Sequence, residues 1–150
     1  GHGNDRSISG QESEVLIEAS SNEEVLSGSI VYALSCRSAK VLGKASISKG
    51  TRSYIGYEED FIFMFSNEKR TRPHEDEIAS LFLEPSNQVP LSLLKGQTAA
   101  SAKDRSKQAF LKNIRKLLTS KASREETFAV KYLLWDMKHQ VCLGDGSACL

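Results

Sequence analysis

Two residues of this chain combine a side chain capable of nucleophilic or acid–base chemistry with a position that would present it to a substrate. Cys36 follows the apolar run at residues 30–34, and His2 stands between two glycines near the start of the chain. A thiolate attacks carbonyl carbon readily, and a neutral histidine within hydrogen-bond reach is the usual base that activates it. Cys36 and His2 are therefore the pair that predicts nucleophilic cysteine chemistry.

Each of these residues also has a simpler interpretation. Free cysteine is among the most often buried residue types, so Cys36 considered alone is better explained by packing. A Gly-His pair at the start of a chain is also what a cloning scar leaves behind. The flanking glycines would let the His2 imidazole lie on an exposed loop in either case.

The pattern around Cys36 predicts the elements that would position it. Residues 30–34, Ile-Val-Tyr-Ala-Leu, favour a strand that is buried on both faces in a helix-covered parallel sheet. A helical period follows until Gly50, and residues 53–57 predict a second strand. Cys36 would then lie at the carboxyl end of the first strand of a βαβ unit, where α/β sheets bind ligands and where a helix dipole favours the thiolate.

Two segments of the first half fit more than one structure. Residues 15–26 fit a short strand at 15–17 or an amphipathic segment that opens a brief helix at Asn22. The apolar run at residues 61–65 fits a strand or the start of a buried helix, which periodicity does not separate. The polar residues 4–14 predict a surface loop.

The second half of the chain predicts mainly helices. A short helix is expected near residues 75–83, and Pro85 and Pro90 predict a connection after it. A long helix from about residue 91, or two helices with a break near Gly96, is expected to follow.

A last helix is expected from residue 123 to about residue 139, and residues 141–146 predict a short strand and a turn. The apolar side chains of the last two helices are expected to face the core. These are Phe110, Ile114, Leu117, Leu118, Phe128 and Trp135.

Length and charge exclude several classes of protein. The 150 residues fit one domain, which we take to span residues 1–150. Lys and Arg total 20 against 19 Asp and Glu, and this net charge of +1 lacks the excess positive charge typical of nucleic-acid binding. No apolar run is long enough to cross a bilayer. We therefore expect neither nucleic acid nor membrane as a partner.

The cysteines indicate a reducing compartment. Cys36, Cys142 and Cys149 are an odd number without C-x-x-C spacing, which disfavours both a disulfide framework and a zinc site. His74 and His139 have no neighbours at metal-ligand spacing and are expected at the surface. The expectation is a cytoplasmic protein with no metal and no cofactor.

The order of the motifs adds a more specific prediction. Gly1-His2-Gly3 is followed, a few tens of residues later, by an apolar strand that ends in a small residue and Cys36. This order resembles the caspase-haemoglobinase peptidases, which include caspases, gingipains, separases, legumains and the bacterial CHAT proteins. Shorter matches are Leu42-Gly43, Lys49-Gly50, Tyr54-Ile-Gly-Tyr57 and Leu143-Gly144-Asp145, the last similar to a closing Gly-Asp-Pro with Gly146 in place of Pro.

The resemblance implies a fold and a dyad. The fold would be α/β, a three-layer caspase-like fold with a mostly parallel sheet between helices, whose N-terminal strands are missing from this chain. Cys36 would be the nucleophile and His2 the proton carrier. The backbone N–H groups of Gly3 and Cys36 would form the oxyanion hole, in which fixed donors stabilise the developing negative charge.

The resemblance also implies a substrate pocket. The strand at residues 54–57 would border it through Tyr57, and the three carboxylates that follow would lie at its rim. A carboxylate in this place selects Arg or Lys through a charge-assisted pair, whereas the alternative is a solvated acidic turn. The three carboxylates are those of Glu58, Glu59 and Asp60.

The implied function is that of a cysteine endopeptidase. Cys36 would attack a peptide carbonyl to form an acyl-enzyme, which water activated through His2 would release. The partners would be a protein or peptide substrate and upstream domains of the same protein, since the chain starts at Gly-His-Gly without an initiator Met. The alternative is an inactive caspase-like scaffold or signalling module in which Cys36 only packs.

Overall fold

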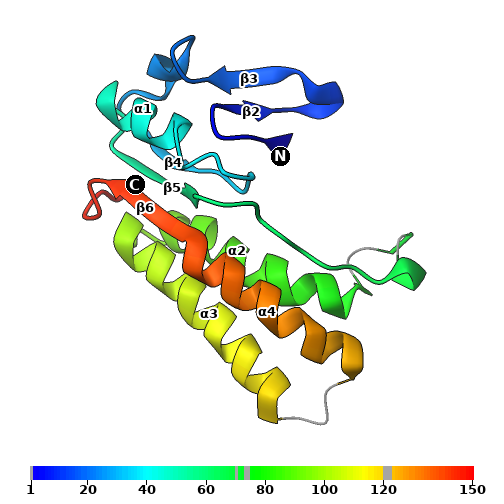
Figure 1. Ribbon diagram of the computed structural model, residues 1–150. Coiled ribbons are helices and arrows are strands. Elements are labelled where there is room, and N and C mark those ends of the chain that lie inside the picture. The colour runs from blue at the N-terminus through cyan, green and yellow to red at the C-terminus, as the bar shows by residue number, and fades with distance from the viewer. Residues whose placement is uncertain (1, 70, 73–74, 120–122) are drawn as a thin grey trace.

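The described part of the chain forms an α/β structure with two three-stranded sheets and four α-helices (Figure 1). This computed structural model describes residues 2–69, 71–72, 75–119 and 123–150, so that Gly1 and His74 lie outside the described part. The first sheet contains β1 (His2–Gly3), β2 (Ser7–Ser9) and β3 (Val15–Glu18), and the second contains β4 (Ile30–Tyr32), β5 (Ser53–Tyr57) and β6 (Gln140–Gly144). The α-helices are α1 (Leu42–Ser48), α2 (Glu77–Leu94), α3 (Ala99–Thr119) and α4 (Arg124–His139).

The first sheet corrects the prediction of a surface loop at residues 4–14, because β2 lies within it. A tight turn between β1 and β2 depends on Asn4, whose Oδ1 accepts from the N–H groups of Arg6 at 2.8 Å and Ser7 at 2.9 Å. Such an Asn side chain imitates a backbone turn and lets a polar segment reverse direction. Both structures considered for residues 15–26 occur in sequence, as β3 and then a 3₁₀ helix, η2 (Glu23–Leu26).

The second sheet contains the predicted βαβ unit. β4 and β5 are parallel and α1 connects them, while β6 pairs with β5 in the antiparallel direction. β5 is the strand predicted at residues 53–57, and every residue of it is buried. β4 differs from its prediction, since its residues are only half-buried and, among the described residues, it pairs with β5 alone. The sheet is mixed rather than mostly parallel.

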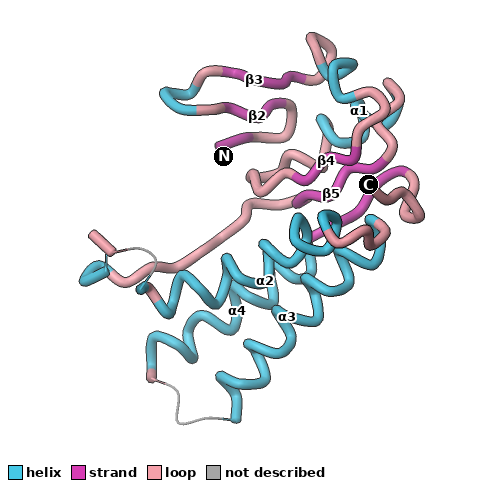
Figure 2. The backbone as a smooth tube through the Cα atoms, turned by 180° about the vertical axis from the view of Figure 1, so that it is seen from behind, coloured by secondary structure: helices cyan, strands magenta, loops and turns pink. Residues whose placement is uncertain are grey.

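Helix α1 lies on one side of this sheet and α2 and α3 lie on the other (Figures 1 and 2). Apolar side chains on the two faces of the sheet pack against these different helices. Tyr54 of β5 packs on the face that contacts Ile47 of α1 and Ile8 of β2. Ile55, the next residue, packs on the opposite face against α2 and α3, because successive side chains of a strand point to opposite faces. The sheet therefore lies between helices, and the α/β class is confirmed.

The long helix α2 corrects the prediction that Pro85 and Pro90 mark a connection. Proline lacks an N–H and leaves the carbonyl four residues earlier without its helical partner. Here the two freed carbonyls are satisfied by side chains: Asn113 Nδ2 donates to Leu81 O at 2.9 Å, and the Tyr32 hydroxyl donates to Ser86 O at 2.9 Å. Tertiary hydrogen bonds thus let the helix continue through both prolines.

The other helices follow the prediction more closely. The break before α3 falls at Gly96, whose φ of 74° is the left-handed conformation that ends helices. Three side chains that were predicted to face the core do not belong to it: Leu118, Phe128 and Trp135 are 65%, 50% and 39% exposed. No helix in the described part of the chain has the length and apolar character to span a membrane.

Residues 61–65 form neither a strand nor a helix but an irregular segment. The segment runs from the end of β5 toward the N-terminus of α2 (Figure 2). Its aromatic residues alternate, with ring centroids 6.5 Å apart for Phe61 and Phe63 and 6.0 Å apart for Phe63 and Phe65. Without a neighbouring strand among the described residues, the apolar run does not become part of a sheet.

Candidate cysteine–histidine site

Cys36 lies beyond the carboxyl end of β4, in turns that connect this strand to α1. Its side chain is half-buried, and the thiol donates to the carbonyl oxygen of Phe61 at a Sγ–O distance of 3.8 Å. Arg37 has a φ of 53°, a left-handed conformation that prevents a helix from starting at Cys36. Because α1 begins only at Leu42, the expected helix-dipole effect on the thiol is not supported by the structure.

His2 belongs to β1, which lies against the residue that precedes Cys36. A Cβ atom placed on Gly3 would overlap the Oγ of Ser35 and would lie 2.9 Å from Ser7 O. Only glycine allows this close approach of β1 to the turns between β4 and α1, which we call the Cys36 loop. His2 and Cys36 are thus each one residue away from the same contact, and the His2 side chain is exposed.

Among the residues that the structure describes, no hydrogen bond occupies the backbone donors expected to form the oxyanion hole. Asn4 N–H donates to Ser7 O at 3.0 Å, so Asn4 and Ser7 form a bonded pair of the β1–β2 ladder. Bonded and non-bonded pairs alternate in such a ladder, so the N–H of Gly3 points away from β2. Among the described residues, no hydrogen bond uses the N–H of Cys36.

Tyr57 is not placed at the rim of a pocket. Its side chain is fully buried on the face of the sheet that α2 covers. There its hydroxyl lies 3.1 Å from Ser86 Oγ and accepts from Gln140 Nε2 at 3.0 Å. Burial raises the pKa of the Tyr57 hydroxyl. Because side chains two residues apart in a strand share a face, Tyr57 lies on the same face as Ile55, toward α2.

Two of the three rim carboxylates are held by basic residues of the Cys36 loop. Glu59 Oε1 lies 3.3 Å from Lys40 Nζ, and Asp60 Oδ1 lies 3.1 Å from Arg37 Nε. Glu58 is half-buried, and its N–H donates to His139 O at 3.0 Å. The acidic turn is therefore partly neutralised within the chain, which favours the interpretation of a solvated turn.

Arg37 also has a second acidic partner, which the sequence patterns do not indicate. The same Nε atom lies 3.2 Å from Asp5 Oδ1, and the backbone oxygen of Asp5 accepts from Leu42 N–H at 2.9 Å. Asp5, Arg37 and Asp60 come from three separate parts of the chain, so no local spacing could have shown that they meet. The turn that follows β1 is thus attached to the Cys36 loop at two points.

Helix α4 fixes the backbone on both sides of Phe61, whose carbonyl contacts Cys36. Trp135 Nε1 donates to Asp60 O at 2.9 Å, and Ile62 N–H donates to Asp136 Oδ1 at 3.0 Å. Asp136 is fully buried, and this burial raises the pKa of its carboxyl to about 8. One wall of the Cys36 site is therefore positioned by a helix on the far side of the sheet.

The other candidate ligands lie apart from this site. Cys142 Sγ lies 3.4 Å from Ser53 Oγ between β6 and β5, and Cys149 is exposed near the C-terminus. The His139 ring packs on Trp135, with centroids 4.1 Å apart. Within the described ranges, no three His, Cys, Asp or Glu side chains gather in a way that would hold a metal ion.

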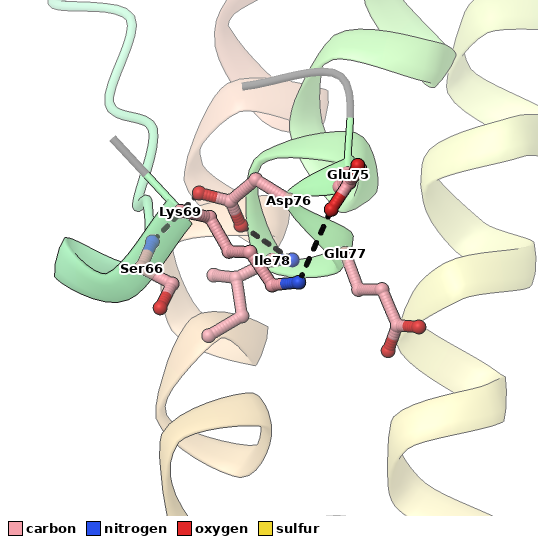
Figure 3. A pocket seen from close by; sticks show the side chains of 6 residues that line it. All are labelled: Ser66, Lys69, Glu75, Asp76, Glu77 and Ile78. Atoms are coloured by element: carbon pink, nitrogen blue, oxygen red, sulfur yellow. Dashed lines mark hydrogen bonds and ion pairs between the residues drawn. The ribbon is translucent and has the colours of Figure 1, made fainter. Parts of the chain in front are cut away.

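A hollow of about 310 Å³ at the N-terminus of α2 has a structural explanation (Figure 3). Asp76 caps the helix there: its Oδ1 accepts from the N–H groups of Ile78 and Ala79, each at 3.0 Å. Its Oδ2 accepts from Ser66 N–H at 2.7 Å, and Lys69 Nζ lies 3.5 Å from Glu75 Oε2. Because both oxygens of Asp76 are occupied, this carboxylate serves the helix and its connecting loop.

Comparison with known proteins gives no relative for this chain: no family model, no curated protein and no solved structure matches it. The geometry of the Cys36 site therefore carries the functional interpretation.

Proposed function

We propose that this chain is part of a cysteine peptidase that uses Cys36 as nucleophile and His2 as proton carrier. The observation that carries the proposal is the contact between Gly3 and Ser35. This contact brings the segment of His2 and the segment of Cys36 together from separate parts of the sequence. A dyad needs no further side chain, because the tetrahedral intermediate is stabilised by backbone donors. The N–H groups of Gly3 and Cys36 would supply them.

The reaction would begin with a change in the thiol's hydrogen bond. In the structure the Cys36 thiol donates to Phe61 O, and it must turn toward the exposed His2 ring to lose its proton. The thiolate would attack the peptide carbonyl, and His2 would return the proton to the leaving amine. A water molecule that loses its proton to His2 would then cleave the thioester and restore the thiol.

The fold provides supporting context for a caspase-like domain. Cys36 follows the carboxyl end of a parallel strand pair, and helices cover both faces of the sheet. In the described part of the chain β4 pairs on one edge only, which would be where the missing N-terminal strands implied by the resemblance join the sheet. A peptide or protein substrate and a reducing, cytoplasmic location belong to the proposal, since all three cysteines are free.

An electrophilic peptide ketone tests the proposal, because it alkylates a cysteine that is activated by a neighbouring base. We expect the ketone to label Cys36, with the rate lowered by about tenfold or more in the His2→Ala variant, the range that one acid–base residue contributes. The Cys36→Ser variant controls for labelling at Cys142 and Cys149. Equal labelling of the three cysteines would show that Cys36 is not an activated nucleophile.

One observation favours an inactive scaffold as the second candidate. The Cys36 thiol bonds to Phe61 O, and no hydrogen bond joins His2 to Cys36 among the described residues. If the scaffold interpretation is right, the His2→Ala variant will leave the rate of Cys36 labelling unchanged. The same labelling experiment therefore separates the two candidates.

A further inference from the structure

The ion pairs around Arg37 connect the three segments that meet at the proposed site. Arg37 Nε lies 3.2 Å from Asp5 Oδ1 and 3.1 Å from Asp60 Oδ1. Asp5 belongs to the turn after His2, Arg37 follows Cys36 directly, and Asp60 precedes Phe61, whose carbonyl accepts from the thiol. One guanidinium group therefore contacts the segments that carry the base, the nucleophile and the wall of the site.

The backbone around Arg37 is held in place as well. Its N–H donates to Glu59 O at 3.2 Å, and its φ of 53° is a conformation that non-glycine residues adopt only when their surroundings impose it. The Asp5 backbone oxygen accepts from Leu42 N–H at 2.9 Å. The guanidinium thus joins segments whose main chains are already fixed close to one another.

We infer that Arg37 is a positioning residue of the proposed site, which holds the His2 turn against the Cys36 loop through Asp5. This inference rests on the proposed function. β1 contains only two residues and His2 is exposed, so the short ladder to β2 gives His2 little fixation of its own. The Gly3 contact with Ser35 and the hydrogen bond from Leu42 N–H to Asp5 O hold the main chain of this segment near Cys36, and the Arg37–Asp5 ion pair is the side-chain link that adds to them.

The charged side chains are between 37% and 57% exposed, so each ion pair contributes little to the stability of the fold. Their effect on catalysis can be larger, because a small displacement of a base relative to its nucleophile slows proton transfer strongly. The role of Arg37 should therefore appear as a loss of coupling between His2 and Cys36 rather than as unfolding.

A double-mutant cycle measures this coupling through the rate at which iodoacetamide alkylates Cys36 in the folded protein. We expect His2→Ala to slow alkylation by about tenfold or more in the wild-type chain, and by less than about threefold in the Arg37→Met chain. Arg37→Lys keeps the positive charge and should restore part of the His2 dependence. A purely structural role of Arg37 would lower the rate without changing the effect of His2→Ala.

Two further variants keep the test decisive if Arg37→Met does not fold. Asp5→Ala and Asp60→Ala each remove one carboxylate at nearly the same distance from Arg37 Nε, but only Asp5 belongs to the His2 turn. The inference predicts that Asp5→Ala abolishes the His2 dependence, whereas Asp60→Ala preserves it.

The outcomes separate this inference from the proposed function. If His2→Ala slows alkylation equally in the wild-type, Arg37→Met and Asp5→Ala chains, the dyad stands and the role of Arg37 is refuted. If His2→Ala has no effect in the wild-type chain, the dyad itself is refuted, and the positioning role with it.

Discussion

Among the described carboxyl groups with a shifted pKa, Asp136 is the one whose pKa burial raises. It is 0% exposed, and its Oδ1 accepts from Ile62 N–H. Its Oδ2 and the Oε1 of Gln140, one turn further along, are buried and have no hydrogen-bond partner among the described atoms. Burial disfavours the charged form, and with a pKa of about 8 the group is mainly a neutral carboxylic acid at pH 7.

The Asp136→Asn variant should be more stable than the wild type at alkaline pH. The pKa of the carboxyl is raised from 3.8 to about 8 on folding, so the folded state binds more protons than the unfolded state between these values. The free energy of unfolding of the wild type should therefore fall from about pH 4 to about pH 8, by roughly 3–5 kcal/mol from this group. Asparagine has no such loss and still accepts from Ile62 N–H.

Urea unfolding at several pH values measures this difference. The advantage of Asp136→Asn over the wild type should grow with pH and become constant above about pH 8. As a control, Asp136→Leu at pH 5 should be less stable than the wild type by about 1–3 kcal/mol, because it leaves Ile62 N–H without an acceptor. A pH-independent difference between Asn and wild type would contradict the neutral, buried carboxyl.

At the scale of residues, the sequence supplied the candidates but not their surroundings. Cys36 and His2 were selected among three cysteines and three histidines by their positions, Cys36 after an apolar run and His2 between two glycines. The contact of Gly3 with Ser35 and the ion pairs of Arg37 join segments far apart in the chain, which local patterns do not report. Tyr57 could not be placed correctly, because the face toward which a fully buried strand turns each side chain depends on its neighbours.

At the scale of elements, α2 shows how tertiary contacts override a local rule. Proline inside a helix costs about 3 kcal/mol on average, which is why Pro85 and Pro90 predicted a connection. Each carbonyl that they free accepts a hydrogen bond from a side chain of another element. Asn113 of α3 donates to Leu81 O, and Tyr32 of β4 donates to Ser86 O. The donors lie far away in sequence, so the helix could not be predicted across these prolines.

A double-mutant cycle between Asn113 and Pro85 tests this explanation. Asn113→Ala removes the donor to Leu81 O and should lower the free energy of unfolding by about 1 kcal/mol. In the Pro85→Ala chain, a new backbone N–H can donate to Leu81 O, so Asn113→Ala should cost less than about 0.5 kcal/mol. Equal costs in both chains, measured by urea unfolding, would mean that Asn113 does not compensate for the proline.

Elements with a strong local pattern were predicted well. The strand predicted at residues 53–57 is β5, and the α2–α3 break falls at a glycine with positive φ. The prediction of a strand or helix at residues 61–65 was wrong. A strand needs a partner, and no described strand lies beside this segment. The prediction that Phe128 and Trp135 lie in the core was wrong, because helical periodicity identifies an apolar stripe but not whether another element covers it.

At the scale of the whole molecule, the sequence predicted the α/β class and a sheet between helices, but not the direction of β6. This last strand comes from the end of the chain and pairs with β5 in the antiparallel direction, so the sheet is mixed. The direction is set by α4, which returns the chain to the sheet. The resulting arrangement leaves the Cys36 loop between the first sheet and the segment held by α4, which is the basis of the proposed site (Figure 1).

The competition among the three cysteines for limiting iodoacetamide tests the central claim most directly, because each chain contains its own controls. Cys149 is exposed while Cys36 and Cys142 are half-buried, so accessibility alone predicts that Cys149 reacts first. An activated nucleophile predicts that Cys36 reacts first, by about tenfold or more over both others, as mass spectrometry of the digested protein would show. Preferential labelling of Cys149, with Cys36 no faster than Cys142, would contradict the proposed cysteine–histidine site.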